Sequence, residues 1–339
     1  MMELARAREL VARFKKQKIL VLGDLMLDRF IRGNVERISP EAPVPVVLVD
    51  QETDMPGGAA NVAMNVRSLG GQAAVAGIVG RDKTGDDLIR GLGRAGISTQ
   101  GVLRVEGVIT TEKTRIMAER QQVVRVDREH PVRFGPDILR ALAGRIGKSM
   151  KDCSGAVIAD YNKGVVRQPA IDAILRAARK TAVPVGYDPK EDKGIRVRGI
   201  AVATPNCREA HACAGLTPRS HVADPLKDKT LREAAKRLMA RWKPEALVIT
   251  LGPQGMYLLP ADARPVQIPT RAREVYDVSG AGDTVIATCL LALSAGASLV
   301  EAAILGNYAA GVVVGKLGTA TCSPAELLEN VARDHEGAA

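Results

Sequence analysis

Short apolar runs that favour β-strands alternate along this chain with segments that carry Ala, Leu, Arg and Lys at helical spacing. Because parallel strands need a long crossover connection, strands separated by helices are typical of a parallel sheet with helices on both faces. The strand-like runs are 18–23, 73–79, 156–159, 183–187, 200–204 and 246–251, and the helical segments between them include 57–69, 168–180 and 231–240. The alternation predicts an α/β fold in three layers, α/β/α, with a mostly parallel central sheet.

Two segments, 30–49 and 109–127, interrupt this alternation. Both are rich in Val, Ile, Thr and Arg, and their partial period of two residues indicates strands outside the main sheet. We expect them to form a small antiparallel β lid over one end of that sheet. The sequence has no internal repeat and no low-complexity linker, so residues 1–339 are predicted to form a single domain with the lid strands inserted.

The charge and the composition narrow the class of partner. With 48 Lys and Arg against 38 Asp and Glu, the net charge is +10, which suits nucleic acid, an acidic lipid surface or a phosphorylated small molecule. Aromatic residues make up only 3% of the chain, too few for a base-stacking surface, so no nucleic acid partner is expected. The five cysteines form no CxxC pair and follow no secretory signal, which favours a reducing cytoplasm.

The segment 284–315 contains a single charged residue, Glu301, and must be weighed as a membrane span. Residues 294–298 are typical of a turn, and Ser298 with Glu301 three positions later has the pattern of a capping box, which opens a new helix. Two short buried helices fit this pattern better than one span. We therefore expect no membrane association.

The strongest chemical signal is the run Asp277-Val278-Ser279-Gly280-Ala281-Gly282-Asp283, which directly precedes an apolar helical segment. Backbone N–H groups at the start of that helix can converge on an anion, and the helix dipole adds positive potential. Asp283, in the first turn, could accept a proton from a hydroxyl that attacks a phosphoryl group. The alternative is a glycine-rich turn with Asp283 as an ordinary N-terminal cap.

Two other glycine-rich runs match nucleotide-binding patterns only in part. The run 91–96 fits GxGxxG, but it closes a helical segment instead of following a strand, so helix termination is the better interpretation. The run 311–316 has too few residues between its glycines for a P-loop, and Leu317 stands where a P-loop has Ser or Thr. Neither run predicts a nucleotide site.

The run 277–283 resembles the signature of the PfkB, or ribokinase-like, carbohydrate kinases. A second run, PGGAANVA at 56–63, is similar to the N-terminal glycine-rich signature of the same family. The resemblance implies a ribokinase-like fold and a sugar kinase activity. The implied catalytic residues are Asp283 as the base with Gly280, Ala281 and Gly282 around the transferred group, and the implied sugar contacts are Gly57, Gly58 and Asn61.

Further matches to the family follow the predicted strands, at the sheet edge where open α/β sheets bind ligands. By resemblance, Asp24 would bind sugar hydroxyls, while Asn206 and Glu209 would organise Mg²⁺ and phosphates through water. Taken alone, the Asn206-x-x-Glu209 pattern indicates only an ordinary helix start. The resemblance thus implies ATP and Mg²⁺ as cofactors, with further ATP-binding residues at Thr250, Gly252, Gly255, Ser279 and Asn307.

Within the family, the runs 23–29 (GDLMLDR) and 37–46 (RISPEAPVPV) are similar to the subgroup that phosphorylates D-glycero-β-D-manno-heptose 7-phosphate, and the resemblance extends over about 18–328. It implies phosphorylation at O1 to the 1,7-bisphosphate, an early step toward ADP-heptose and the lipopolysaccharide core. The chain has no HxGH motif of an adenylyltransferase, so a stand-alone kinase is expected. The alternatives are a kinase for another sugar or a nucleoside, and a catalytically silent sugar-binding regulator.

A phosphosugar substrate would also account for part of the basic excess, because Arg and Lys suit phosphate recognition. Each basic lid residue could equally be a solvated strand charge. The exposed lid strands further predict a homodimer that hides their edges. The candidate phosphate or sugar ligands are Lys113, Arg115, Arg120 and Arg125 in the lid and Asp160, Asn162, Lys163 and Lys190 in loops.

Overall fold

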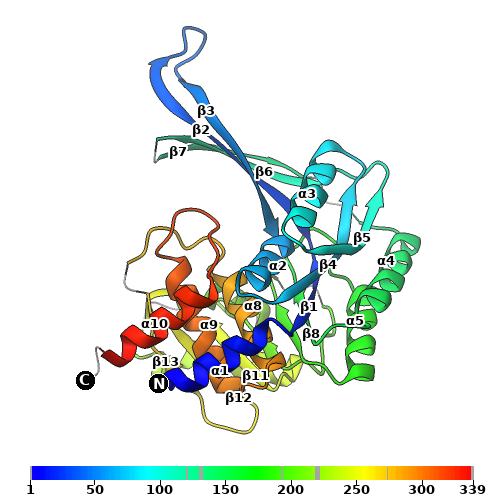
Figure 1. Cartoon of the computed structure of the whole chain (residues 1–339), viewed down its shortest axis with the longest axis vertical. Coiled ribbons are helices and arrows are strands. Elements are labelled where there is room, and N and C mark those ends of the chain that lie inside the picture. The colour runs from blue at the N-terminus through cyan, green and yellow to red at the C-terminus, as the bar shows by residue number, and fades with distance from the viewer. Residues whose placement is uncertain are drawn as a thin grey trace.

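A large sheet forms the centre of the molecule (Figure 1). The structure, a computed structural model, describes residues 2–119, 121–129, 133–191, 194–217, 222–272 and 274–336. In spatial order the strands are β13 (Val266–Ile268), β12 (Met256–Pro260), β11 (Ala246–Thr250), β10 (Val202–Ala203), β9 (Val185–Asp188), β8 (Gly155–Ala159), β1 (Lys18–Gly23), β4 (Gln72–Gly80) and β5 (Ser98–Val105). Neighbours from β11 to β5 pair in parallel, and β12 and β13 are antiparallel at one edge. The expected mostly parallel sheet is confirmed.

Helices cover both faces of this sheet, which confirms the three-layer prediction. One face packs against α1 (Leu4–Phe14), α2 (Ala59–Ser68), α3 (Lys83–Arg94), α8 (Ala281–Ser294), α9 (Leu299–Val313) and α10 (Pro324–Glu336). The other face packs against α4 (Pro136–Ser149), α5 (Gln168–Thr181), α6 (Cys207–Cys213) and α7 (Lys229–Trp242). Each face has its own core of Val, Leu, Ile and Ala, so the strands are apolar on both sides.

The apolar segment 284–315 forms the helices α8 and α9. The helix α8 lies between the sheet and α9, so its side chains meet protein on nearly every side and are apolar nearly all round. Ser298 Oγ accepts the N–H of Glu301 at 3.2 Å, and Glu301 Oε2 accepts the N–H of Ser298 at 2.7 Å. The predicted capping box is confirmed. Within the described ranges, no helix is both long and apolar enough to cross a bilayer.

Both partial nucleotide motifs lie at the C-terminal ends of helices. The helix α3 runs through Gly91 and Gly93, and Gly96 follows it with a φ of +70°. A left-handed glycine just past a helix is a common way for the helix to end. The run 311–316 likewise covers the last turn of α9. Helix termination is therefore the correct interpretation of the GxGxxG match.

A second, four-stranded sheet projects from the body and forms the lid (Figure 1). Its strands, in spatial order, are β3 (Pro45–Gly58), β2 (Leu25–Ile38), β6 (Thr111–Ala118) and β7 (Gln121–Arg128). The hairpins β2–β3 and β6–β7 are antiparallel, and they join through a parallel pairing of β2 with β6. The two segments that interrupt the α/β alternation are thus the source of the lid.

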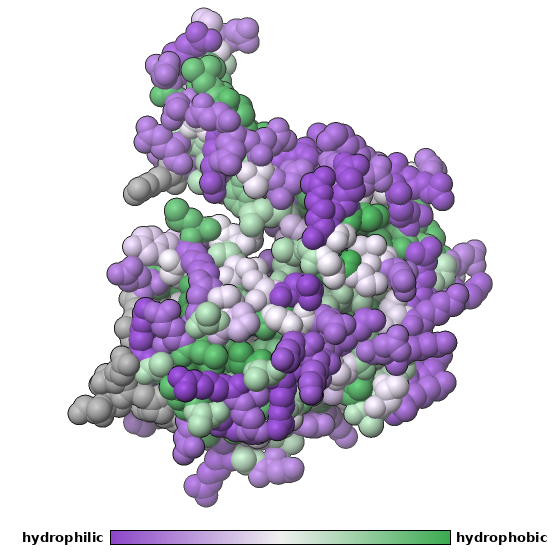
Figure 2. Space-filling view, in the orientation of Figure 1, coloured by the Kyte–Doolittle hydropathy of each residue, from purple (hydrophilic) through white to green (hydrophobic). Residues whose placement is uncertain are grey.

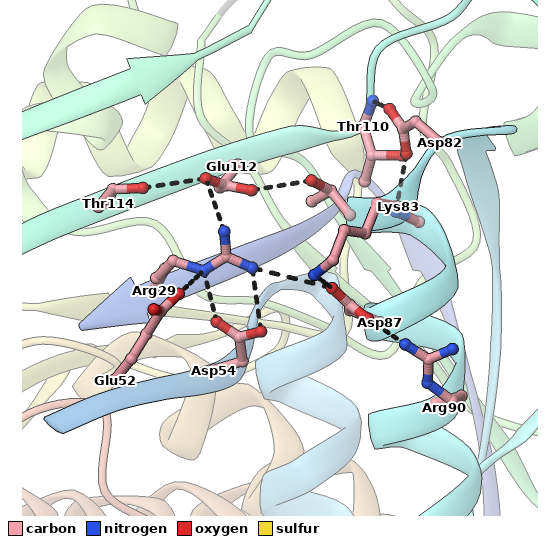
Figure 3. Close-up of polar contacts among 12 residues, drawn as sticks. Arg29, Glu52, Asp54, Asp82, Lys83, Asp87, Arg90, Thr110, Glu112 and Thr114 are labelled. Atoms are coloured by element: carbon pink, nitrogen blue, oxygen red, sulfur yellow. Dashed lines mark hydrogen bonds and ion pairs between the residues drawn. The ribbon is translucent and has the colours of Figure 1, made fainter. Parts of the chain in front are cut away.

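A cluster of charged side chains on the outer face of the lid joins the base of the lid to α3 (Figure 3). Arg29 of β2 lies at the centre and bonds Asp54 at 2.8 Å, with Glu112 at 3.5 Å and Asp87 of α3 at 3.8 Å. Glu112 is 3% exposed and also accepts the hydroxyl of Thr84 at 2.8 Å. A pocket of about 260 Å³ lies beside this cluster, lined by Leu27, Asp54, Pro56, Lys83, Asp87, Leu88, Arg90, Gly91 and Arg94.

The fold brings several loops to one side of the main sheet. Parallel strands end at the same edge, so the segments that follow β1, β8, β9, β10 and β11 all emerge there. The lid strand β2 begins directly after β1, and β3 leads directly into α2. Figure 2 shows the molecule hollowed between the projecting lid and the body. Most predicted site residues come from these loops, the lid and the start of α8, whereas Asn61 lies in α2 and Asn307 in α9.

Candidate active site

Three elements meet at the carboxylate of Asp283, in the first turn of α8. Asn61 of α2 donates from Nδ2 to Asp283 Oδ2 at 2.6 Å. The hydroxyl of Tyr161, in the loop after β8, donates to Asp283 Oδ1. Both oxygens of the predicted base are therefore held by donors from other elements. Asn61 was predicted as a sugar contact, and the partner that the structure gives its amide is this carboxylate.

The surroundings of Asp283 make its carboxyl more basic than usual. Burial raises its pKa to about 6, and the negative charge of Asp28 acts in the same direction. The hydrogen bonds from Tyr161 and Asn61 and the charge of Lys190 oppose this rise. A carboxyl with a pKa near 6 is ionised at neutral pH and accepts a proton more readily than an ordinary aspartate. Asp283 therefore has the properties of a general base.

The start of α8 presents backbone N–H groups beside this carboxylate. Gly280 has a φ of +80°, and a Cβ at this position would lie 2.9 Å from Asn61 Nδ2, so both backbone and space favour glycine. Ala281 and Gly282 follow in the first turn, whose N–H groups have no acceptor within the helix. The Ala281 N–H makes a 3.3 Å bond to the Val278 carbonyl. This turn combines N–H donors with the positive end of the helix dipole.

Asp277 holds the loop that leads into α8. Its Oδ1 accepts the N–H of Ser279 at 2.9 Å, and its Oδ2 accepts the N–H of Gly318 at 3.1 Å. Ser279, a predicted ATP contact, is exposed at the mouth of this turn. Thr284, the residue after Asp283 in α8, donates its hydroxyl to Asn65 Oδ1 at 2.7 Å, which fixes α8 against α2.

Asp24, predicted to bind sugar hydroxyls, is 1% exposed and accepts three backbone N–H groups. They come from Tyr161 at 2.9 Å, Lys163 at 3.1 Å and Val165 at 2.9 Å. Burial raises the pKa of the Asp24 carboxyl, and these three bonds oppose the rise. The arrangement shows Asp24 as the residue that shapes the loop after β8. A direct bond to sugar stays a prediction.

The loop after β8 carries three further predicted ligands. Asp160 is 2% exposed and accepts the N–H of Asn162 at 2.8 Å. Asn162 has a φ of +61° and donates from Nδ2 to Glu191 at 2.7 Å. Lys163 forms a 2.7 Å ion pair with Glu129, which follows the lid strand β7. These side chains lie together at the edge of the sheet that faces the lid.

The inner face of the lid base carries a second group of charges. Arg115 of β6 donates to Asp28 of β2 at 2.6 Å, and its guanidinium lies 5.3 Å from the centre of the Phe30 ring. A Cβ at Gly57 would lie 2.3 Å from Asp28 Oδ2, so the glycine makes room for this carboxylate. Burial, followed by the charge of Lys163, lowers the pKa of the Lys113 amine.

The other basic lid residues are placed differently. Arg125 pairs with Asp127 of its own strand at 2.8 Å, and both side chains are partly exposed. Arg120 lies outside the described residues.

Gly58, the last residue of β3, has a φ of +58°, and a Cβ there would lie 2.6 Å from the Asp24 carbonyl oxygen. The predicted glycine contacts at 57 and 58 thus lie between Asp24 and Asp28.

The predicted metal and phosphate pair Asn206 and Glu209 forms a helix capping box. Asn206 Oδ1 accepts the N–H of Glu209 at 2.9 Å, and Glu209 Oε2 accepts the N–H of Asn206 at 2.9 Å. The remaining oxygen, Oε1, accepts a 2.9 Å bond from Lys190 Nζ. Lys190, predicted to contact sugar or phosphate, therefore lies beside Glu209. This contact is the main reason that the pKa of Lys190 is raised despite its partial burial, which acts in the opposite direction.

The carboxylates on this side suit a hydrated Mg²⁺. Among the residues that the structure describes, no group of three or more His, Cys, Asp and Glu side chains could hold a metal ion directly. Burial, and then the charges of Glu209 and Asp283, raise the pKa of Asp188 well above its usual value. Mg²⁺ usually keeps several waters and takes one or two carboxylates. Asp188 and Glu209 are the residues that would hold such an ion, and it would neutralise charge on the phosphates.

The remaining predicted ATP contacts have defined structural partners. Thr250, at the end of β11, donates its N–H to the Pro205 carbonyl at 3.1 Å, and Asn307 donates from Nδ2 to the Pro269 carbonyl at 2.6 Å. Gly255 has a φ of +80°, and a Cβ there would lie 2.0 Å from the Ile268 carbonyl oxygen. Gly252 has a φ of +57° with open space around it. The Cβ direction is therefore filled by backbone at Gly255 and open at Gly252.

Three site residues were missed by the sequence reasoning, which gave no role to Tyr161, Asp188 or Asp28. Tyr161 lies two residues after the end of β8, next to Asp160, which was selected. Asp188 is the last residue of β9, two positions before Lys190, which was also selected. Asp28 stands in a run that was used only for its resemblance. For Tyr161 and Asp188 the carboxyl end of a strand was the signal that could have identified them, whereas Asp28 lies inside β2 and nears Gly57 only in the folded chain.

Comparison with known proteins agrees with this geometry. The family model "pfkB family carbohydrate kinase" matches residues 16–326. The fold is that of a ribokinase from Arabidopsis thaliana in complex with ribose and ATP, with a TM-score of 0.68 and 18% identity over 93% of this chain and 98% of that one. It is also that of the tetrameric inhibited form of phosphofructokinase-2 from Escherichia coli, with a TM-score of 0.73 and 21% identity over 94% and 98%.

Curated relatives are more similar in sequence. The chain is 45% identical over 315 residues to "Bifunctional protein HldE" of Halorhodospira halophila, covering 93% of this chain and 63% of that protein. It is 41% identical over 334 residues to the protein of the same name from Geobacter sulfurreducens, covering 98% and 67%. The chain thus spans about two thirds of the length of these relatives. It belongs to the PfkB family of carbohydrate kinases, enzymes that use ATP.

Proposed function

We propose that this kinase transfers the γ-phosphoryl group of ATP to O1 of D-glycero-β-D-manno-heptose 7-phosphate, giving the 1,7-bisphosphate and ADP. The observation that carries the proposal is the Asp283 carboxylate, held by Asn61 and Tyr161 beside the N–H groups that begin α8. Such a site places a base and an anion-binding turn together, which is what phosphoryl transfer to a hydroxyl requires.

In the proposed reaction the sugar O1 attacks the γ-phosphorus and the bond from that phosphorus to the bridging oxygen of ADP breaks. The O1 proton passes to the Asp283 carboxylate. The N–H groups of Gly280, Ala281 and Gly282 face the oxygens of the transferred group, where charge builds up. We place ATP between this turn and the 250–255 loop, with Thr250, Gly252, Gly255, Ser279 and Asn307 around it.

A heptose that already carries a phosphate suits the charges on the inner face of the lid. Lys113 and Lys163 lie near enough for the charge of one to lower the pKa of the other, and Arg115 lies on the same strand as Lys113. A dianionic phosphate would relieve this repulsion. We propose that these residues bind the 7-phosphate, and that Asp24, Gly57, Gly58, Asp160, Asn162 and Lys190 line the sugar site.

The choice of heptose also rests on the similarity of the runs 23–29 and 37–46 to the heptose 7-phosphate kinase subgroup. The relatives from Halorhodospira and Geobacter, both called bifunctional, are compatible with it. We further propose a cytoplasmic enzyme that works with Mg²⁺, held through water by Glu209 and Asn206 or Asp188, and that assembles as a homodimer through its lid strands.

The test is a substrate panel with a variant of the base. ADP release should be fastest with heptose 7-phosphate and at least tenfold slower with ribose, fructose 6-phosphate, adenosine or the heptose without its phosphate. Asp283→Asn should lower kcat by about 10²- to 10⁴-fold, because the general base is lost, and leave ATP binding by calorimetry nearly unchanged.

Two results would contradict the proposal. Equal or faster turnover of another sugar would exclude heptose 7-phosphate as the substrate. An Asp283→Asn protein with undiminished kcat would exclude Asp283 as the base. Binding of heptose 7-phosphate without any ADP release from the native protein would instead favour a silent sugar-binding regulator.

A further inference from the structure

The base is held from two sides, and one of them is the loop that carries predicted sugar ligands. Asn61 belongs to α2 and contacts Asp283 Oδ2 at 2.6 Å. Tyr161 contacts Oδ1 and directly precedes Asn162 and Lys163 in the loop after β8. The orientation of the base therefore depends on a loop whose next residues are proposed sugar ligands.

Tyr161 is itself fixed by the Asp24 carboxylate. Asp24 Oδ2 accepts the N–H groups of Tyr161 at 2.9 Å and of Lys163 at 3.1 Å, and Oδ1 accepts that of Val165 at 2.9 Å. The Tyr161 side chain packs against the core on the α8 face of the sheet. With its backbone bonded to Asp24 and its ring packed, the hydroxyl has one direction in which to point, toward Asp283.

The hydroxyl of Tyr161 is a donor throughout the working range of pH. Burial and the neighbouring charge of Asp283 raise its pKa well above the usual value, so it stays protonated. A donor to a carboxylate stabilises the ionised form, which is the form that accepts the O1 proton. The Asn61 amide does the same on the other oxygen.

We propose that Tyr161 is a positioning residue for phosphoryl transfer: its hydroxyl fixes the Asp283 carboxylate and so couples the sugar-binding loop to the base. The inference rests on the proposed function, because it requires Asp283 to be the base, but it holds for any sugar. A sugar bound by residues 162 and 163 would thus be held by the same loop that fixes the base. No covalent step is assigned to Tyr161.

The pH dependence of turnover follows from the charges that face Asp283. Asp28 approaches from β2 and raises its pKa, whereas Lys190, from the loop after β9, lowers it, as do Tyr161 and Asn61. On the β9 side, Asp188 and Glu209 face Tyr161. Removal of the Tyr161 donor leaves burial and Asp28 less opposed, so the pKa of Asp283 must rise. The acidic limb of kcat, where the base becomes protonated, then moves to higher pH.

The test is Tyr161→Phe, which keeps the ring and removes only the hydroxyl. We expect kcat to fall by about 10- to 100-fold with little change in KM for ATP. A slightly misplaced base slows the phosphoryl transfer step but does not weaken the binding of ATP. We also expect the acidic limb, near pH 6 in the native enzyme, to rise by about one unit. Tyr257→Phe, in β12 and likewise buried, should show neither effect.

A second measurement needs no turnover. Carboxyl ¹³C resonances of labelled Asp can be followed by NMR titration, with Asp283→Asn identifying the signal of Asp283. Tyr161→Phe should raise the pKa of that signal. A pKa and an acidic limb that both stay in place would overturn the inference, even if kcat fell, because they would reveal a purely structural role. If the native protein fails to phosphorylate heptose 7-phosphate, the proposed substrate is wrong, and the titration still decides the role of Tyr161.

Discussion

A carboxylate at the start of a helix is common. Asp283 differs from an ordinary helix cap in the partners of its two carboxylate oxygens. Two donors from other elements fix its oxygens, and burial together with Asp28 raises its pKa to about 6. An ordinary helix cap would bond the N–H groups of its own first turn. Asp283 directs its oxygens to Asn61 and Tyr161 instead. The surroundings therefore favour chemistry over capping.

Unlike Asp283, Glu209 does cap its helix, and we also propose that the same side chain acts on Mg²⁺. Glutamine can replace glutamate in a capping box, so Glu209→Gln should leave the thermal midpoint within about 2 °C of the native value. The same change removes a charge that we propose to act on Mg²⁺. We expect the Mg²⁺ concentration for half-maximal rate to rise several-fold.

The matched variant for this prediction is Ser298→Ala in the capping box of α9, which has no proposed role in Mg²⁺ binding. It removes the acceptor for the Glu301 N–H and should lower stability by about 1 kcal/mol, with an unchanged Mg²⁺ dependence. Thermal unfolding and a magnesium titration separate the two effects. A Glu209→Gln enzyme with normal Mg²⁺ dependence would restrict Glu209 to capping α6.

At this scale the sequence selected candidate residues but did not predict their contacts. The 277–283 run was sufficient to select Asp283 and the glycine turn. The bonds of Asn61 and Asp24 could not be predicted, because they join residues more than a hundred positions apart in the chain. The strand end marked the loop that carries Tyr161, but the bond of its hydroxyl to Asp283 joins residues 122 positions apart and was likewise not predictable.

Among the elements, the lid depends on its attachment to α3. Arg29 is 17% exposed in its side chain and faces Asp54, Glu112 and Asp87. Arg29→Met would remove the cation that these three carboxylates share, although Asp87 keeps Lys83 and Glu112 keeps Arg128. We therefore expect the free energy of unfolding to fall by about 2–4 kcal/mol in urea denaturation.

The control for Arg29 is Arg125→Met, which removes a partly exposed pair with Asp127 in the same sheet. Exposed pairs contribute little, so its unfolding free energy should change by less than about 1 kcal/mol. Equal losses in the two variants would show that the cluster at Arg29 does not anchor the lid.

Element boundaries show what periodicity can and cannot decide. The 18–23 strand is β1 to the residue, and the 168–180 helix differs from α5 by one position. The segment 30–49, by contrast, became two strands covering 25–38 and 45–58. Its polar, two-sided strands lack the apolar face that marks where a strand begins. The parallel pairing of β2 with β6 depends on a distant partner, so no local pattern predicted it.

For the whole molecule, the exposed lid indicates how two copies would meet. The outer strands of the lid sheet are β3 and β7, and apolar side chains on the lid include Val35, Ile38, Val44, Leu48, Val49, Val123, Val124 and Val126. Figure 2 shows apolar side chains among polar ones on this projection. Unpaired strand edges and exposed valines favour burial against a second copy.

We therefore expect light scattering to give a dimer at micromolar concentration. Val49→Asp combined with Val126→Asp should yield monomers, because two buried charges would then oppose the lid contact. Val300→Asp, on the exposed side of α9, should leave the dimer intact. A native protein that is monomeric across this range would contradict the predicted homodimer.

The three-layer architecture could be predicted almost entirely from the sequence, because crossover helices constrain parallel strands strongly. The two antiparallel strands β12 and β13 and the edge strand β5 were not expected. Edge strands are short or mixed in polarity, so their pattern is weak. The order of strands across the sheet was likewise not predictable from a pattern that repeats along the chain.

One lid strand serves two opposite sides of the protein. Along β2, Asp28 lies on the inner face and bonds Arg115, while its neighbour Arg29 lies on the outer face near Asp87 of α3, which lines the 260 Å³ pocket. Because successive side chains of a strand point to opposite faces, a substitution on the outer face that shifts β2 would also displace Asp28 on the inner face.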